Sequence, residues 1–187
     1  MSDPVSALQG AVAQGFARVE EIGPLGMITL RAKPGTEGLE AAIKAATGCD
    51  LPGARRITHQ GANSCGWMSN DEFLLVLPYA DVAKALAAIA VAMAGAHHLA
   101  VDVSDARAVF RVTGPQADQV LRKLTPADLD KVEADEIRRS RFAQVAAAFW
   151  PVAAAGTDCG YTLVCFRSVA GYVMGLLTHA AQAGSEL

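Results

Sequence analysis

The sequence contains little charge for its length. Charged residues make up 19% of the 187 residues, whereas a typical domain carries roughly 25%. The 19 acidic and 16 basic residues give a formal net charge of −3, and the densest basic cluster is Arg138-Arg139-Ser140-Arg141. A surface that binds nucleic acid needs a basic excess, so we expect no nucleic-acid partner.

The sequence also lacks a long hydrophobic run and a basic leader. The longest apolar run, residues 85–96, consists largely of alanine. It is shorter than the roughly 20 residues that a membrane-spanning helix needs. The first 15 residues carry no basic region ahead of an apolar stretch, as a secretory leader would. We therefore expect a cytoplasmic protein with no membrane partner.

Patterns typical of metal sites and disulfides are absent as well. The sequence contains four cysteines, Cys49, Cys65, Cys159 and Cys165. None of them forms a C-x-x-C pair, and no spacing ties His97-His98 to His59 or His179. We expect no metal site, and we interpret the cysteines as small buried apolar residues, with one reactive thiol as the alternative.

Short strand-like and helix-like segments alternate along the chain. Apolar runs bounded by glycine, proline, asparagine or aspartate predict eight strands. These strands span residues 26–32, 55–60, 65–68, 72–77, 98–103, 108–113, 142–148 and 160–166. Apolar spacing and the capping residues Thr36, Asp81 and Ser168 predict four helices. These helices span residues 36–46, 81–93, 116–124 and 169–183.

This order of elements predicts a mixed α+β fold with two related halves. Each half resembles the split β-α-β arrangement of ferredoxin-like folds, so we expect two small mixed or antiparallel sheets with helices against one face of each. The predicted domain covers residues 25–187, with lobes at about 25–100 and 101–187. Residues 1–24 are expected to form an N-terminal arm that is ordered only where it contacts something.

The turn Thr113-Gly114-Pro115 joins a predicted strand to a predicted helix. The N–H groups at such a helix start could bind an anion. However, proline removes one of these donors and is common in the first helical turn. A single glycine also matches neither a P-loop nor a dinucleotide-binding motif. We therefore interpret the turn as a structural connection.

Two segments are candidates for contact with a partner. Residues 126–141 carry both signs of charge and form a solvated connector or a contact surface. Within this segment, Arg138, Arg139 and Arg141 lie close together without a lysine, and arginine is favoured over lysine at interfaces. Trp150 begins the apolar segment 150–155, which lies either in the core or on a binding surface.

Three segments resemble sequences of a known family. Residues 67–75 (WMSNDEFLL) resemble a W-x-x-x-D-E-[WF]-L-L strand entry. Residues 102–107 (DVSDAR) followed by 111–115 (RVTGP) resemble a segment of the folate-binding domain shared by glycine-cleavage T-proteins and their relatives. Residues 166–172 (FRSVAGY) resemble the F-R-S-x-A-x-Y start of the last helix in the gamma subunit of heterotetrameric sarcosine oxidase.

The resemblance extends over roughly residues 20–185 and implies a two-lobed fold of the folate-binding T-protein type. It also implies a small accessory subunit without catalytic residues, assembled with alpha, beta and delta chains. In such a complex sarcosine is oxidatively demethylated, and its methyl carbon passes to tetrahydrofolate. FAD, FMN, NAD, zinc and tetrahydrofolate would be handled by the other subunits, and this chain would bind none of them.

Two departures from the family argue against an independent aminomethyltransferase. A full T-protein is longer and has further domains after its folate-binding part. The T-protein-like run G-Y-T-G-E-x-G-Y-E is also missing, and residues 155–161 (AGTDCGY) stand near its place.

The resemblance makes Asp102, Asp105 and Arg107 weak candidates for folate binding. An acidic residue in a comparable region of the relatives serves the pterin or the transferred carbon, and a carboxylate there could move a proton. Alternatively, Asp102 and Ser104 bond the local backbone at a strand end, and Arg107 pairs with one of the two aspartates.

Three hypotheses for the function remain. The first is an accessory subunit of a sarcosine oxidase-type complex, which covers apolar surface on the large alpha chain. The second is a stand-alone folate-binding module related to aminomethyltransferases. The third is an independent enzyme that uses a cysteine.

Overall fold

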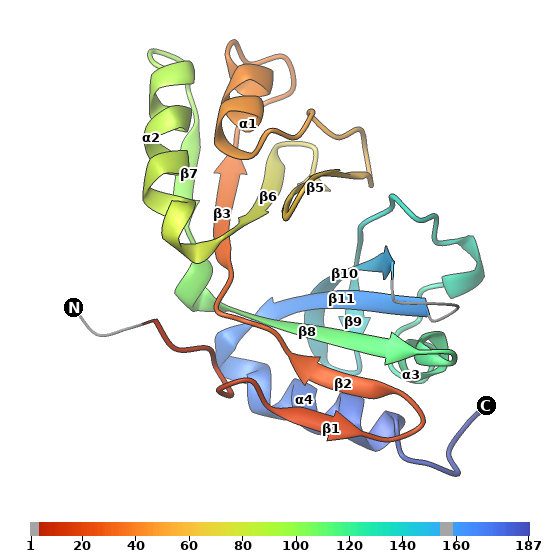
Figure 1. Cartoon of the computed structure of the whole chain (residues 1–187). Coiled ribbons are helices and arrows are strands. Elements are labelled where there is room, and N and C mark those ends of the chain that lie inside the picture. Colours follow the sequence, from red (N-terminus) through yellow and green to blue (C-terminus); the bar gives the residue numbers. More distant parts are fainter. Residues whose placement is uncertain (1–3, 154–158) are drawn as a thin grey trace. The chain divides into compact units, whose positions relative to one another are not determined.

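A computed structural model describes residues 4–153 and 159–187 (Figure 1). Within these ranges it contains eleven β-strands and four α-helices. The strands are β1 (Val12–Gln14), β2 (Arg18–Glu21), β3 (Gly26–Arg31), β4 (Ile57–Gln60), β5 (Asn63–Ser69), β6 (Glu72–Leu77), β7 (Leu99–Asp102), β8 (Arg107–Gly114), β9 (Arg138–Phe142), β10 (Val145–Ala153) and β11 (Cys159–Phe166). The helices are α1 (Leu39–Thr47), α2 (Val82–Ala92), α3 (Ala117–Arg122) and α4 (Ala170–Ala180).

The chain folds into two compact units. Unit 1 consists of residues 1–24 together with residues 105–187, and unit 2 consists of residues 25–104. The chain therefore leaves unit 1 after Pro24 and returns to it at Asp105. From the sequence, the second lobe is expected to begin at about residue 101, and residues 1–24 are expected to form a separate N-terminal arm.

Unit 2 is a five-stranded antiparallel sheet with two helices on one face. Its strands follow the order β4-β5-β6-β3-β7. α1 and α2 lie side by side (Figure 1) and pack on the sheet through fully buried residues such as Ile28, Leu30, Ile43 and Ile89. The succession β3-α1-β5-β6-α2-β7 is the ferredoxin-like order that was predicted for this half, with β4 added at the edge.

Gly38 shows why glycine is needed where the two helices of unit 2 meet. It precedes α1 with φ 81°, in the left-handed region that glycine adopts without a steric penalty. A Cβ atom at this position would lie 2.2 Å from the carbonyl oxygen of Ala92 at the end of α2. Gly38 therefore caps α1, a role that the sequence analysis assigned to Thr36.

Unit 1 is a six-stranded antiparallel sheet with α3 and α4 against one face. Its strands follow the order β1-β2-β8-β11-β10-β9. The core between sheet and helices includes Phe110, Phe149, Leu163 and Leu177, all fully buried. The ring of Phe149 meets that of Phe142 edge-on, with 5.5 Å between their centroids.

The N-terminal segment completes the sheet of unit 1. β2 pairs with β8 from Arg18 opposite Thr113 to Glu21 opposite Phe110 (Figure 1). In the β-α-β-β-α-β scheme a strand after α4 would take this place, but residues 181–187 form turns and irregular structure. Residues 18–21, which belong to the N-terminal arm expected to be ordered only where it contacts something, therefore form the strand beside β8.

A buried carboxylate holds the start of the chain on unit 1. Glu21 is 2% exposed and accepts hydrogen bonds from the Ser6 hydroxyl and from the N–H groups of Leu8 and Gly10. Arg167 donates to the carbonyl oxygen of Val5. These contacts satisfy polar groups that would otherwise be costly to bury.

β9 lies where the sequence analysis placed part of a charged connector. It pairs with β10 from Arg138 opposite Phe149 to Phe142 opposite Val145 and forms one edge of the sheet. Pro151 lies in β10 beyond the last residue paired with β9, so its missing N–H interrupts no bond to that strand.

Candidate partner interface and folate-binding residues

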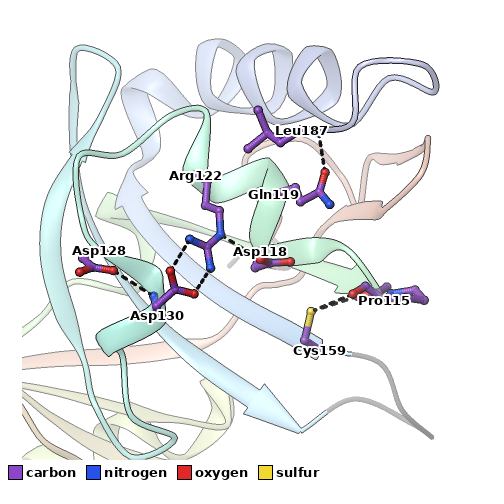
Figure 2. A network of polar contacts seen from close by, with 9 residues as sticks. Pro115, Asp118, Gln119, Arg122, Asp128, Asp130, Cys159 and Leu187 are labelled. Atoms are coloured by element: carbon purple, nitrogen blue, oxygen red, sulfur yellow. Dashed lines mark hydrogen bonds and ion pairs between the residues drawn. The ribbon is translucent and has the colours of Figure 1, made fainter.

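The carbonyl groups of the Gly114-Pro115 turn accept hydrogen bonds from within unit 1. The Cys159 thiol donates to the carbonyl oxygen of Gly114 at 3.2 Å and to that of Pro115 at 3.7 Å (Figure 2). α3, which follows the turn, has only six residues. The structure therefore supports the interpretation of this turn as a connection between β8 and α3.

Arg122 ties α3 to the loop that follows it. Its guanidinium group donates to Asp118 at 2.9 Å and to both carboxylate oxygens of Asp130 at 3.1 and 2.5 Å (Figure 2). These hydrogen bonds hold the pKa of Asp130 below its usual value. Asp128 in turn accepts a hydrogen bond from the N–H of Asp130. This network joins α3 to the following loop through two ion pairs and one backbone hydrogen bond.

Asp102 bonds its local backbone at the end of β7. Its carboxylate accepts hydrogen bonds from the N–H of Ser104 at 2.9 Å and from the Ser104 hydroxyl at 2.5 Å. The Ser104 hydroxyl also accepts the N–H of Met27 at the start of β3. Asp102 therefore joins the ends of two neighbouring strands, as the structural alternative in the sequence analysis stated.

Arg107 stacks on an exposed aromatic ring. Its guanidinium carbon lies 4.2 Å from the centroid of Phe166, the residue opposite it on β11. Phe166 is 52% exposed, and Asp105 is also exposed. Asp105 and Arg107 belong to unit 1 and Asp102 belongs to unit 2. In the structure, Asp102 therefore contacts Ser104, and Arg107 contacts Phe166. The sequence did not indicate Phe166 as a partner of Arg107.

The four partner candidates have different environments. The Arg138 side chain is 21% exposed and donates to the carboxylate of Glu136, which is 1% exposed, at 2.6 Å. Arg139 and Arg141 are exposed on the edge strand β9. Trp150 is 4% exposed and lies within β10, so it is not part of an exposed apolar patch. Residues 154–158 of the segment that follows Trp150 lie outside the described residues.

The cysteines are free thiols in different degrees of burial. Cys49, Cys65 and Cys165 are buried, and Cys159 is half-buried. Burial raises the pKa of Cys65 and raises that of Cys165 to about 11, which keeps both as thiols at neutral pH. Such cysteines are poor nucleophiles.

We expect iodoacetamide to modify Cys159 alone in the folded protein. The other three thiols are protected by burial and should react only after denaturant is added. Mass spectrometry of peptides from the native and denatured protein measures this difference. Rapid modification of Cys49, Cys65 or Cys165 in the folded protein would contradict the expectation and would favour the hypothesis of an enzyme that uses a cysteine.

Further features of the described residues concern metal ions, membranes and surface hollows. Over residues 4–153 and 159–187, His, Cys, Asp and Glu side chains form no group of three that could hold a metal ion. The helices in these ranges are too short or too polar to cross a membrane. A surface hollow of about 680 Å³ lies near the end of α2, and Lys33, Glu37 and His97 on its rim are all exposed.

Comparison with known proteins identifies the family. Residues 31–183 match the family described as sarcosine oxidase, gamma subunit family. The chain belongs to this family. Sarcosine oxidase subunit gamma from Corynebacterium sp. (strain P-1) and that from Arthrobacter sp. are each 33% identical over 132 residues. The matches cover 67% of this chain and 64% of each relative, just under two thirds of their length.

Solved structures share the predicted fold. A chain of heterotetrameric sarcosine oxidase from Corynebacterium sp. U-96, in complex with pyrrole 2-carboxylate, is 26% identical with a TM-score of 0.78, and the match covers 91% of this chain and 87% of that one. Aminomethyltransferase T of the glycine cleavage system from Bartonella henselae is 13% identical, with a TM-score of 0.66 over 91% of this chain and 48% of that one. The predicted T-protein-like fold is confirmed.

Proposed function

We propose that this chain is a non-catalytic accessory subunit of a heterotetrameric sarcosine oxidase in the cytoplasm. Its partners are alpha, beta and delta chains, which carry FAD, FMN, NAD, zinc and tetrahydrofolate. The complex oxidatively demethylates sarcosine and transfers the one-carbon unit to tetrahydrofolate. The observation that carries this proposal is the match over 91% of the chain to one chain of a heterotetrameric sarcosine oxidase.

The environments of the candidate residues support a structural role. Asp102 is engaged by Ser104, and Arg138 is engaged by Glu136. A general base must reach the proton it abstracts, and the hydrogen bonds of Asp102 serve a strand end instead. Arg139 and Arg141 are exposed, so we still predict that these two arginines contact a partner.

Co-expression with the flavoprotein chains tests this proposal. A tag on this chain is expected to recover a flavin-containing complex that oxidises sarcosine, and leaving the chain out of the co-expression should abolish assembly. In the complex, Asp102→Ala and Asp105→Ala are expected to leave kcat unchanged, because neither side chain takes part in the chemistry. Recovery of the tagged chain alone, without flavin, would refute the assignment.

The alternative of a stand-alone folate-binding module predicts that the isolated chain binds tetrahydrofolate. Calorimetric titration of the isolated chain with tetrahydrofolate distinguishes the two: an accessory subunit gives no binding heat at about millimolar ligand. Saturable binding that Arg107→Met abolishes would favour the folate module.

A further inference from the structure

β7 presents an edge of the sheet of unit 2 with unused backbone hydrogen-bonding groups. It pairs with β3 on one side only, because the strand order of this sheet ends at β7. The N–H of Val103 donates to the carbonyl oxygen of Met27. Since successive residues of a strand alternate in direction, Val101 and Leu99 also bond toward β3. The N–H and C=O groups of Ala100 and Asp102 therefore point away from the sheet.

Two of the other three sheet edges carry features that discourage pairing with another chain, and the third is polar. Short edge strands and charged side chains are the usual protection against such pairing. β1 has three residues, and β9 carries Arg138, Arg139 and Arg141. β4 carries the polar side chains of Thr58, His59 and Gln60. β7 reads Leu-Ala-Val-Asp, so its first three residues carry neither charge nor proline.

The side chains of β7 add an exposed apolar surface to this free edge. Leu99 is 54% exposed and Val101 is 40% exposed. Both lie on the same face of the sheet, because they are two residues apart in a strand. Their cross-strand neighbours on β3 are Arg31 and Thr29, which are not buried either. An added strand would bond to Ala100 and Asp102 and cover Leu99 and Val101.

We propose that β7 is the docking edge for an extended segment of another subunit in the heterotetramer, which adds as a sixth strand to the sheet of unit 2. This inference rests on the proposed function, because it takes the occupant from the partner chains of that complex. The segment carries apolar side chains at alternate positions, which cover Leu99 and Val101, and its backbone bonds to Ala100 and Asp102.

A second copy of this chain is a poorer occupant than a partner subunit. β7 has four residues, and two such strands paired with each other bury far less than the roughly 1,200 Å² of a stable interface. A strand from a partner subunit of the proposed complex would form one part of the contact between the two subunits, so the small area of β7 alone does not limit it. The same edge thus suits a heteromeric assembly.

Val101→Lys in the co-expressed complex tests this proposal. A lysine on the free edge opposes strand addition, so we expect the recovery of partner chains to fall at least about tenfold. The matched control is Val12→Lys, which places the same substitution on the exposed edge strand β1 and should leave recovery unchanged. Both isolated variants are expected to keep the wild-type melting temperature, because both valines are substantially exposed.

Hydrogen exchange on the wild-type complex supplies the second measurement. The amides of Ala100 and Asp102 are expected to exchange rapidly in the isolated chain and to be protected in the complex. A wild-type complex that assembles while these amides stay unprotected, or while Val101→Lys assembles normally, overturns the β7 proposal and leaves the proposed function intact. Failure of the wild-type chain to recover any partner overturns both. A homodimer of the isolated chain that Val101→Lys dissociates shows that the occupant is a second copy.

Discussion

Gly15→Ala is expected to destabilise unit 1 by about 3 kcal/mol. Gly15 lies between β1 and β2, and a Cβ atom there would be 1.7 Å from the carbonyl oxygen of Ala181. This oxygen accepts the N–H of Phe16 at 2.9 Å, which joins the β1–β2 turn to the end of α4. An alanine must therefore push the turn away from the helix and break this hydrogen bond.

The two tryptophans allow this loss to be measured in unit 1 alone. Trp150 belongs to unit 1 and Trp67 to unit 2, so Trp67→Phe leaves Trp150 as the only tryptophan, and its fluorescence reports on unit 1. Urea unfolding of Gly15→Ala in this background should show a lower midpoint than the parent. The parent itself must first show a cooperative transition.

Gly175→Ala is the matched control for this substitution. Gly175 lies inside α4, and its Cβ position has no atom within 4 Å. Alanine is favoured over glycine in a helix interior by about 1 kcal/mol, so the control should raise the midpoint. If Gly15→Ala were as stable as the parent, the close packing of the N-terminal turn on α4 would be refuted.

Local patterns were sufficient to predict unit 2. Its strands and helices follow one another over residues 25–104, and each has an apolar pattern that packs on its sequence neighbours. β3, β6 and α2 therefore appear at nearly the predicted residues. The extra polar edge strand β4 was also expected, within the predicted segment 55–60.

Unit 1 depends on contacts that local patterns do not reveal. β2 reads Arg-Val-Glu-Glu, and its place is set by pairing with β8, which lies about ninety residues further along the chain. β9 reads Arg-Arg-Ser-Arg-Phe, and its charges are typical of a loop. It forms a strand because β10 supplies its backbone partners after a short turn. Pairing with a neighbouring strand therefore decided both elements, over a long sequence distance for β2 and across a short turn for β9.

The contacts of the candidate site residues also could not be predicted from local sequence patterns. The motif around residues 102–107 identified the family but not the use of its side chains, because Asp102 serves Ser104. The sequence left open whether Trp150 lies in the core or on the surface, and only the position of β10 in the sheet decides its burial. The contact of Arg107 with Phe166 depends on the pairing of β8 with β11, which local sequence patterns do not reveal.

Arg138→Met is expected to destabilise unit 1 by about 3 kcal/mol. Arg138 donates its Nε–H to Glu136 at 2.6 Å, and a second guanidinium nitrogen donates to the other carboxylate oxygen at 3.3 Å. Methionine keeps the length of the side chain but removes the charge and both donors. The buried Glu136 carboxylate then loses this ion pair, and removing one member of a buried pair is costly.

Arg141→Met separates this internal role from a partner contact. Arg141 lies on the same strand as Arg138 but is exposed, so its substitution should change the stability of the isolated chain by less than about 0.5 kcal/mol. Recovery of the partner chains is expected to fall for Arg141→Met at unchanged stability, since its charge is available to a partner. Urea unfolding and co-purification of both variants measure the two effects. Equal stability of Arg138→Met and the wild type would show that the Arg138–Glu136 pair contributes nothing to folding, and Arg138 would then return to the candidates for partner contact.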